Sequence, residues 1–220
     1  MTPALPTLDL EGRLLAQTPL IIALDEVGRG ALAGPVAVGA VIIDAAVVAV
    51  GIPEGLRDSK LVPEKRRAEV AARAQAWALA DAVGWAQAAE IDEIGIVPAL
   101  GLAAARAIRA AAAQLPVDPA RAIVLLDGNH DYVSAAYGPG LDVRTVIKGD
   151  RDCASMSAAS VIAKVARDER MARIARDFPR YEWEKNKGYA SAAHRAAIRE
   201  IGLTDHHRKS WAITDAPALF

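Results

Sequence analysis

The sequence has little cysteine, no long apolar run and no excess of charge, and each shortage excludes a class of protein. Its 220 residues include one cysteine, Cys153, so neither an internal disulfide framework nor a zinc site built on several cysteines can form. A single thiol is typical of a reducing compartment, and we expect a cytoplasmic protein. No run reaches the roughly 18 apolar residues of a membrane-spanning helix, so we expect no membrane partner.

The N-terminus and the overall charge narrow the possibilities further. Residues 1–19 lack the basic start and apolar stretch of a signal peptide, and we expect a variable lead-in there. The formal net charge is −1, whereas proteins that coat nucleic acid are usually basic. A nucleic-acid partner would therefore require positive charge that is gathered locally on the surface.

The chain is 53% hydrophobic, which is enough to bury one sizeable core. β-Branched and apolar runs predict strands over 21–25, 35–43, 85–90, 121–129 and 141–150. Alanine-rich segments of helical period predict helices over 63–82, about 97–114 and 157–177, and a short helix after residue 189. A hairpin followed by strands that alternate with helices indicates an α/β protein with a mixed sheet flanked by helices.

Three of the predicted strands end on acidic side chains. Asp25 and Glu26 follow the run LIIAL, Asp127 ends AIVLLD, and Asp150 ends TVIKGD. Ligands commonly bind at strand ends in α/β sheets, and gathered carboxylates raise one another's pKa values unless a cation balances them. Oxygen ligands without a Cys or His cluster favour Mg²⁺ or Mn²⁺, and two such ions can serve phosphodiester hydrolysis. Any one of these acids taken alone could instead be a turn residue or a helix cap.

Seven segments in order resemble bacterial type 2 ribonuclease H, ribonuclease HII. They are DEVGRGALAGPV, DSKLVPEKRR, LLDGN, VIKGD, SAASVIAKVARD, NKGYASAAH and TDHHRKSW, and they run from about Ile21 to Trp211. The resemblance implies an RNase H-like catalytic domain over 20–178 and a small helical, substrate-contacting extension over 179–220. It also implies metal-dependent cleavage of the RNA strand of RNA–DNA hybrids, in primer removal and in removal of ribonucleotides from DNA. At a single ribonucleotide in duplex DNA, the implied cut lies on the 5′ side and leaves a 3′-hydroxyl and a 5′-phosphate.

The resemblance also assigns roles to individual residues. It makes Asp25, Glu26, Asp127 and Asp150 the catalytic ligands of Mn²⁺ or Mg²⁺. The turn Gly28-Arg29-Gly30 becomes the sensor of the ribose 2′-hydroxyl, the group that distinguishes RNA from DNA. Glycines have no Cβ, so the backbone of such a turn can approach a sugar closely. From the residues alone, the sequence is also that of a plain tight turn with a solvated Arg29.

Further candidates lie outside the acids and the turn. By resemblance, Tyr189 stacks on the sugar on the 3′ side of the ribonucleotide, although an ordinary loop aromatic is the alternative. Phosphate contacts are expected from Lys60, Lys148, Ser157 and Ser160. Ser157 opens the predicted helix and could equally be its N-cap. A local basic surface, or alternatively a solvated face, is expected from Lys185, Lys187, His194, Arg195 and His206 to Lys209.

Two other functions fit part of the pattern. A resolvase-like or transposase-like nuclease would share the carboxylates but would need neither the Gly-Arg-Gly turn nor Tyr189. A non-catalytic nucleic-acid-binding module would need only the basic residues. Type 3 ribonuclease H would be expected to carry a further N-terminal domain before the acidic pair. We expect a monomer, and we expect no sliding-clamp contact because the C-terminal TDAPALF lacks the glutamine of clamp-binding peptides.

Overall fold

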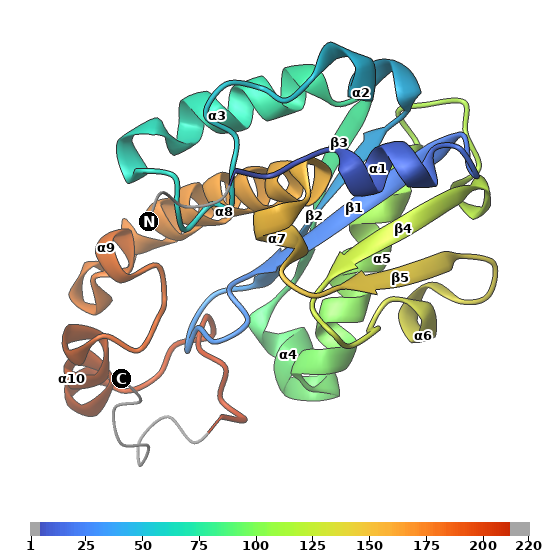
Figure 1. The fold of residues 1–220 in the computed structure, drawn as a ribbon. Coiled ribbons are helices and arrows are strands. Elements are labelled where there is room, and N and C mark those ends of the chain that lie inside the picture. The colour runs from blue at the N-terminus through green and yellow to red at the C-terminus, as the bar shows by residue number, and fades with distance from the viewer. Residues whose placement is uncertain (1–4, 212–220) are drawn as a thin grey trace.

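The computed structural model describes residues 5–211 and contains one five-stranded sheet with helices on both faces (Figure 1). The strands are β1 (Leu20–Val27), β2 (Val36–Ile43), β3 (Ala80–Ala86), β4 (Ala122–Asp127) and β5 (Asp142–Val146). The α-helices are α1 (Asp9–Leu14), α2 (Ala45–Val50), α3 (Glu64–Trp77), α4 (Ala88–Ile94), α5 (Ile96–Ala112), α6 (Ser134–Tyr137), α7 (Gly149–Asp152), α8 (Ala154–Ala175), α9 (Trp183–Asn186) and α10 (Ala192–Ile201). Short 3₁₀ turns are η1 (Pro119–Arg121) and η2 (Pro179–Tyr181).

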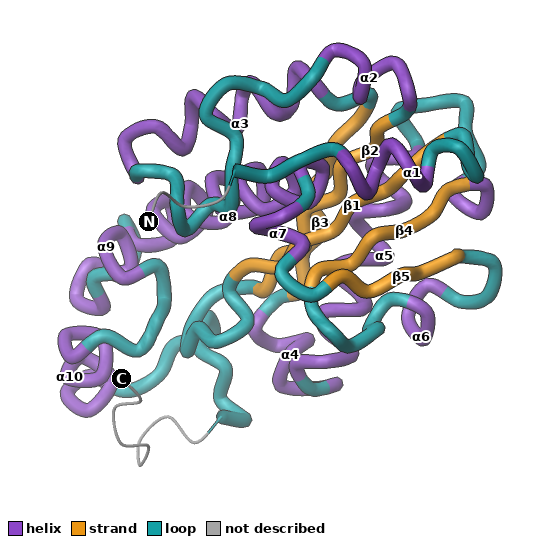
Figure 2. The backbone as a smooth tube through the Cα atoms, viewed as in Figure 1, coloured by secondary structure: helices purple, strands orange, loops and turns teal. Residues whose placement is uncertain are grey.

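The sheet is mixed, as the sequence predicts. Its strand order is β3-β2-β1-β4-β5 (Figure 2). The three strands β1 to β3 pair antiparallel, whereas β1 pairs with β4, and β4 with β5, in parallel. The parallel register sets Leu24 opposite Leu126, so β1 and β4 end at the same edge of the sheet.

Both faces of the sheet are buried, which explains its unbroken apolar runs. Ile22 and Leu24 belong to the apolar cluster that β1 forms with α5. Ile21 and Ala23 belong to the cluster on the opposite face, which includes the first turns of α8 and part of α3. Because successive strand residues point to opposite faces, a strand covered on both sides must be apolar at every position.

The prediction was wrong at the boundary between the first long helix and the sheet. The helix predicted over 63–82 ends at Trp77, and the strand predicted over 85–90 is β3, which starts earlier, at Ala80. Alanine-rich sequence fits either a helix or a strand, so pairing decided the outcome: β3 lies along β2 from Ala80 opposite Ile42 to Ala86 opposite Val36. The segment after β3 forms α4, which a capping box of Gln87 and Glu90 starts.

The C-terminal helices enclose a small apolar cluster of their own. After α8, the chain forms η2, α9 and α10 around Tyr181, Trp183 and Ile198. The segment beyond α10 then runs back beside the loop between β1 and β2, where His207 bridges to Ala33 (Figure 1). The extension is thus tied to the end of β1, while its predicted boundaries stay predictions. Among residues 5–211, no helix has the length and apolarity to cross a membrane.

Candidate active site

Parallel pairing brings three of the four predicted acids to one edge of the sheet. Asp25 and Glu26 occupy the end of β1, and Asp127 is the last residue of β4. Along β1, Asp25 follows the alternation of Ile21 and Ala23 towards α8. Glu26 follows the alternation of Ile22 and Leu24 towards the α5 face. The acidic pair therefore projects to opposite sides of the sheet edge.

Asp150 reaches this edge by a route that the sequence did not predict. The strand β5 ends at Val146, and Asp150 lies in the one-turn helix α7. Lys148 adopts a left-handed conformation, with φ of 60°, which breaks the strand and starts the turn. The main-chain amide of Asp150 then donates a hydrogen bond of 3.2 Å to Oδ1 of Asp127. A turn, and not a strand end, thus sets Asp150 beside Asp127.

The two serines of α8 that are predicted to contact phosphate make internal hydrogen bonds in the structure. Helix α8 begins at Ala154, so Ser157 is neither its first residue nor its N-cap. The buried hydroxyl of Ser157 donates to the carbonyl of Asp150 at 2.6 Å. The buried hydroxyls of Ser160 and Ser59 are hydrogen-bonded to each other at 3.0 Å, and the hydroxyl of Ser160 also contacts the carboxylate of Asp25. These two serines therefore support the acidic site from inside the protein, and their contact with a phosphate stays a prediction.

The acids form an electrostatically strained group. Burial raises the pKa of Asp25 well above its ordinary value, and the hydrogen bond from Ser160 only partly opposes this. Repulsion from Asp127, Glu26 and Asp150 raises the same pKa further. Burial, followed by repulsion from Asp150, also raises the pKa of Asp127. The site thus holds more negative charge than its surroundings balance, and a cation would stabilise it.

The side chains at this sheet edge offer the kind of donor atom that a hard divalent cation prefers. All four acids offer carboxylate oxygens, the donors that Mg²⁺ and Mn²⁺ prefer. Within residues 5–211, no three acidic, His or Cys side chains are gathered into a ready-made metal-binding group. Part of the charge is instead met by Lys60, whose Nζ lies 2.9 Å from Oδ2 of Asp150.

The predicted turn and tyrosine share a cavity with two of the acids, Asp25 and Glu26. It has a volume of about 490 Å³. Its lining includes Asp25, Glu26, Gly28, Arg29, Gly30, Ser59, Lys60, Arg67, Lys164 and Tyr189. The structure therefore brings together side chains that lie more than a hundred residues apart in the sequence. Lys148, Asp127 and Asp150 are not among the lining residues.

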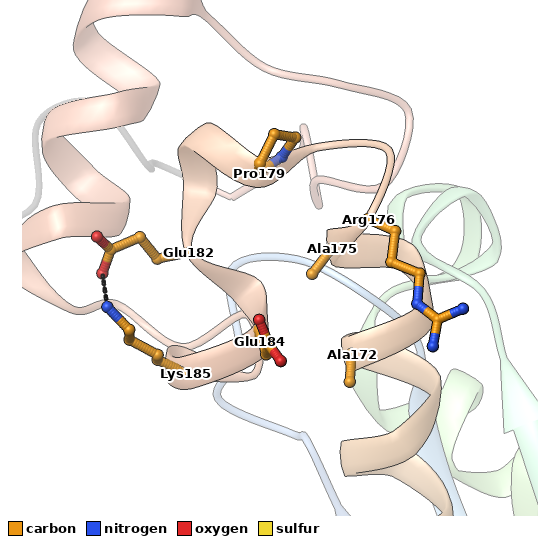
Figure 3. A pocket seen from close by; sticks show the side chains of 7 residues that line it. All are labelled: Ala172, Ala175, Arg176, Pro179, Glu182, Glu184 and Lys185. Carbon is orange, nitrogen blue, oxygen red and sulfur yellow. Dashed lines mark ion pairs between the residues drawn. The ribbon is translucent and has the colours of Figure 1, made fainter.

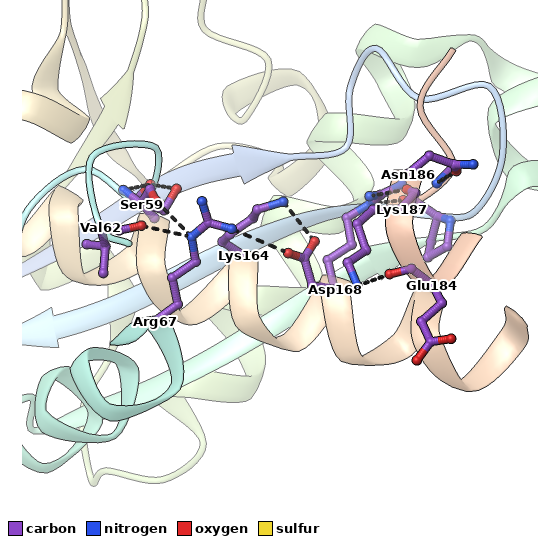
Figure 4. A network of polar contacts seen from close by, with 12 residues as sticks. Ser59, Val62, Arg67, Lys164, Asp168, Glu184, Asn186 and Lys187 are labelled. Atoms are coloured by element: carbon purple, nitrogen blue, oxygen red, sulfur yellow. Dashed lines mark hydrogen bonds and ion pairs between the residues drawn. The ribbon is translucent and has the colours of Figure 1, made fainter. Parts of the chain in front are cut away.

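Arg67 and Lys164 give the cavity positive walls, and the sequence did not single them out. Arg67 is fixed by donating from Nε to the carbonyls of Ser59 and Val62, each at 3.2 Å (Figure 4). Lys164 Nζ lies 2.8 Å from Oδ1 of Asp168, the salt bridge that the helix spacing indicates (Figure 4). Local positive charge is thus present at the site despite the net charge of −1.

Two buried arginines, Arg167 and Arg208, support the Gly-Arg-Gly turn. Gly28 has φ of +84°, and a Cβ there would lie 2.0 Å from Nε of Arg167. Arg208 donates to the carbonyls of Gly28 and Arg29, each at 2.6 Å. Gly30 differs, because a Cβ there would meet no atom within 4 Å. The fold therefore requires glycine at Gly28 but leaves Gly30 open towards the cavity.

The same arginines join the turn to the tyrosine loop. Arg167 donates from Nη1 to the carbonyl of Lys187 at 2.9 Å, and its guanidinium lies 5.4 Å from the ring centre of Tyr189. The carbonyl of Gly188 accepts from the amide of Leu32 at 2.8 Å. The turn and Tyr189 are consequently held in one fixed relation. One signal could have revealed Arg167: it falls four residues after Ala163 and four before Met171, on the buried stripe of α8.

The basic C-terminal surface was predicted partly wrongly. His194, His207 and Arg208 are buried and are engaged in internal hydrogen bonds. Trp183 Nε1 donates to His194 at 2.9 Å, and burial lowers the pKa of His207 to about 4, so this histidine is neutral near pH 7. These three residues hold the extension together. The surface charge of the predicted cluster comes from the exposed Lys185 and Lys209 and from the partly buried Lys187 and Arg195.

A second cavity lies in the C-terminal extension but offers no comparable chemistry. It has a volume of about 390 Å³ and lies between α8 and the segment that contains η2 and α9 (Figure 3). Arg176, Glu182 and Lys185 line it, with Glu182 and Lys185 3.9 Å apart. None of the four strand-edge acids reaches this cavity, so the catalytic candidate remains the carboxylate edge.

The surplus charge leads to a prediction on stability. We expect Asp25→Asn to stabilise the metal-free protein at neutral pH by about 1 kcal/mol, the usual size of a favourable substitution. The folded-state pKa of Asp25 lies above its ordinary value of 3.8. Its stabilising contribution is therefore fully present below pH 3.8 and is lost as pH rises through the raised pKa. Urea unfolding in EDTA between pH 4 and 8 measures this, with Asp118→Asn as a control far from the site. A destabilised Asp25→Asn, or an unchanged pH dependence, contradicts the electrostatic account.

Comparisons with known proteins agree on one family. The family model described as Ribonuclease HII matches residues 22–214. A Ribonuclease HII of Streptomyces coelicolor is 46% identical over 216 residues, covering 96% of this chain and 85% of that protein. A Ribonuclease HII of Roseobacter denitrificans is 42% identical over 191 residues, covering 87% of this chain and 89% of that protein.

Solved structures of low identity share the fold. The ribonuclease H2 of Pyrococcus horikoshii OT3 has a TM-score of 0.64 at 21% identity, covering 89% of this chain and 95% of the other. A Bst-RNase HIII, determined in complex with Mn²⁺, has a TM-score of 0.68 at 20% identity, covering 91% and 70%. The matched family model and the bacterial relatives show that the chain belongs to the ribonuclease HII family.

Proposed function

We propose that this chain is a metal-dependent endoribonuclease that cuts on the 5′ side of ribonucleotides, both in RNA–DNA hybrids and singly in duplex DNA. Membership of the ribonuclease HII family makes it a ribonuclease H that acts on RNA–DNA hybrids. The single observation that supports the finer proposal is the shared cavity, in which Asp25 and Glu26, the Gly-Arg-Gly turn and Tyr189 line one space of about 490 Å³.

Asp25, Glu26, Asp127 and Asp150 are the proposed metal ligands. A divalent cation bound there, in one or two copies, supplies Lewis-acid activation of water and neutralises charge on the phosphate. Mn²⁺ and Mg²⁺ both suit the carboxylate donors. Lys60, Arg67 and Lys164 attract the phosphodiester, and Lys60 can exchange its contact with Asp150 for a phosphate oxygen.

The turn and the tyrosine are the proposed readers of sugar chemistry. The 2′-hydroxyl both donates and accepts, so main-chain amides and carbonyls of Gly28, Arg29 and Gly30 can recognise it. Tyr189 is 36% exposed, and its ring can stack on the next sugar on the 3′ side. A resolvase-like nuclease would not need these groups beside its acids, and a binding module would not need the acids.

Gly30→Ala provides a test of close backbone approach. The added methyl group meets no protein atom within 4 Å, so we expect stability within about 0.5 kcal/mol of the parent. If a ribose approaches this backbone, hybrid cleavage falls about tenfold or more, because a misplaced substrate reacts slowly. Single-turnover kinetics measures the effect. Gly12→Ala, at another position with nothing within 4 Å, is the matched control and should cleave normally. Full activity of Gly30→Ala would remove the turn from ribose recognition.

The reaction itself is tested with a hybrid labelled on both strands. With Mn²⁺ or Mg²⁺, we expect internal cuts in the RNA strand, an intact DNA strand and 5′-phosphate ends on the products. EDTA should abolish cleavage, and adding each metal in turn should restore it. Cleavage of the DNA strand, or cleavage that persists in EDTA, would contradict the proposal.

We also propose that the protein acts as a monomer in the cytoplasm, in ribonucleotide and RNA primer removal from DNA. Sedimentation at micromolar concentration tests the oligomeric state.

The structural relative from Archaeoglobus fulgidus was determined in a PCNA:RNase HII complex. For this chain we propose no clamp contact through TDAPALF, which lies outside the described residues. A pull-down with a bacterial clamp tests that proposal.

A further inference from the structure

The two acids of the β1 doublet are supported from opposite faces of the sheet. Asp25 meets the hydroxyl of Ser160 on the α8 side. On the α5 side, Glu26 accepts a hydrogen bond through Oε2 from Oη of Tyr132 at 3.0 Å. Tyr132 is 5% exposed and belongs to the apolar cluster on that face. A phenol is protonated at neutral pH, so the hydroxyl of Tyr132 donates this hydrogen bond.

The backbone of Tyr132 is fixed on both sides. Oδ1 of the preceding residue, Asp131, accepts from the amides of Val133 and Ser134 at 2.8 and 3.0 Å, just before α6 and at its first residue. Across from it, a Cβ on Gly101 would lie 2.3 Å from the carbonyl oxygen of Tyr132. The glycine within α5 thus lets the loop rest against the helix. The phenol is delivered to Glu26 from a rigid position.

The remaining contact of Glu26 is weaker. Its Oε1 lies 3.4 Å from Nη1 of Arg29, whose side chain is 53% exposed. Exposed ion pairs of this length fix a carboxylate poorly. Tyr132 therefore provides the only hydrogen bond from a buried side chain that Glu26 makes within the described part of the chain.

We propose that Tyr132 is a positioning residue that orients the Glu26 carboxylate for binding a divalent cation. The inference rests on the proposed role of Glu26 as a metal ligand. A carboxylate oxygen that accepts one hydrogen bond keeps a further lone pair, so the phenol orients Glu26 without blocking it. Hydrogen-bond partners of metal ligands commonly change metal affinity or activity by about 10- to 100-fold when they are removed.

Tyr132→Phe removes the hydroxyl and keeps the ring. The probe is Mn²⁺ alone, with the bound fraction obtained from the EPR signal of the free ion and no nucleic acid present. We expect the Kd for Mn²⁺ to rise about tenfold. The matched control is Tyr181→Phe. Tyr181 is 3% exposed and donates to the carbonyl of Gly202 at 2.8 Å, so the control loses a comparable bond in the C-terminal extension. It should bind Mn²⁺ as the parent does.

The double variant Glu26→Gln with Tyr132→Phe shows whether Tyr132 acts on Mn²⁺ binding through Glu26, and Glu26→Gln alone shows whether Glu26 binds the metal. Glu26→Gln should weaken Mn²⁺ binding, and adding Tyr132→Phe to it should change the Kd by less than twofold, because the two residues act together. In cleavage assays, the Mn²⁺ concentration for half-maximal rate should rise with the Kd in Tyr132→Phe, and saturating Mn²⁺ should restore most of the rate.

Three outcomes overturn the account at different levels. If Glu26→Gln binds Mn²⁺ like the parent, the proposed metal site itself fails, and the role of Tyr132 with it. If Glu26→Gln weakens binding while Tyr132→Phe matches Tyr181→Phe, only the positioning role fails. If the double variant shows the full product of both effects, Tyr132 acts without Glu26, and the inference is wrong.

Discussion

Asp127→Asn should slow hybrid cleavage about a thousandfold or more while hybrid binding persists. The substitution removes one charge from the carboxylate edge but keeps Oδ1, which can still accept from the amide of Asp150. The positions of the neighbouring acids should therefore survive, whereas the charge that holds a divalent cation falls. Binding persists because Lys60, Arg67 and Lys164 still line the cavity with positive charge. Single-turnover kinetics with Mn²⁺ measures cleavage, and fluorescence anisotropy of a labelled hybrid measures binding.

The segment just before β4 offers a matched control for this prediction. Asp118 precedes β4 at its opposite end, and its Oδ1 likewise accepts a main-chain amide, that of Ala120, at 2.9 Å. Asp118→Asn should cleave at the parent rate. Turnover retained in Asp127→Asn, or an equal loss in Asp118→Asn, would take Asp127 out of the reaction.

Arg208→Met should destabilise the fold by about 3 kcal/mol and should also slow hybrid cleavage. Arg208 is 0% exposed, and its guanidinium serves the carbonyls of Gly28, Arg29 and Gly34. Methionine fills part of the space but leaves these carbonyls without a donor. The turn should then lose its fixed shape, so cleavage of hybrids should fall more than the loss of folded protein explains. Urea unfolding and cleavage per folded molecule measure the two effects.

Arg106→Met is the comparison for Arg208→Met. Arg106 also donates to a carbonyl, that of Trp85 at 2.7 Å, and pairs with Glu90 at 2.8 Å. Its side chain is 44% exposed, so water replaces the lost partners and the expected cost is below about 1 kcal/mol. Equal losses in the two variants would show that the buried arginine does not support the turn.

The convergence of Asp25 and Asp127 at one edge of the sheet could be predicted because each acid ends a recognisable apolar run. A buried apolar run followed by a carboxylate can be recognised within a few residues, as for Asp25 and Asp127. Parallel pairing then brings such ends together. Asp150 was predicted as a member of the site but as a strand end. The left-handed turn at Lys148, which carries it to Asp127, has no strong signal in the sequence, because lysine rarely adopts that conformation.

The burial of the C-terminal histidines and arginine could not be predicted from their own segment. In sequence, HHRK is a basic cluster, and basic clusters usually face solvent. Arg208 can be buried because carbonyl groups that lie 174 to 180 residues earlier in the chain accept its hydrogen bonds. Only the tertiary fold reveals such a partner. Likewise, the alanine-rich stretch around Leu79 became part of the link between α3 and β3 because β2 offered an open edge.

The C-terminal extension thus has a structural role that its charge alone does not suggest. Arg208 supports the Gly-Arg-Gly turn from below, and Arg167 joins that turn to the loop of Tyr189. The two proposed readers of the sugar are therefore held at a set spacing beside the acids.

The most direct test of the account uses duplex DNA with one embedded ribonucleotide, compared with the same duplex made of DNA alone. With Mn²⁺ or Mg²⁺, the account predicts one cut on the 5′ side of the ribonucleotide, which leaves a 3′-hydroxyl and a 5′-phosphate, and no cut in the all-DNA duplex. Equal cleavage of both duplexes, or no cut at the ribonucleotide while long hybrids are cleaved, would contradict it.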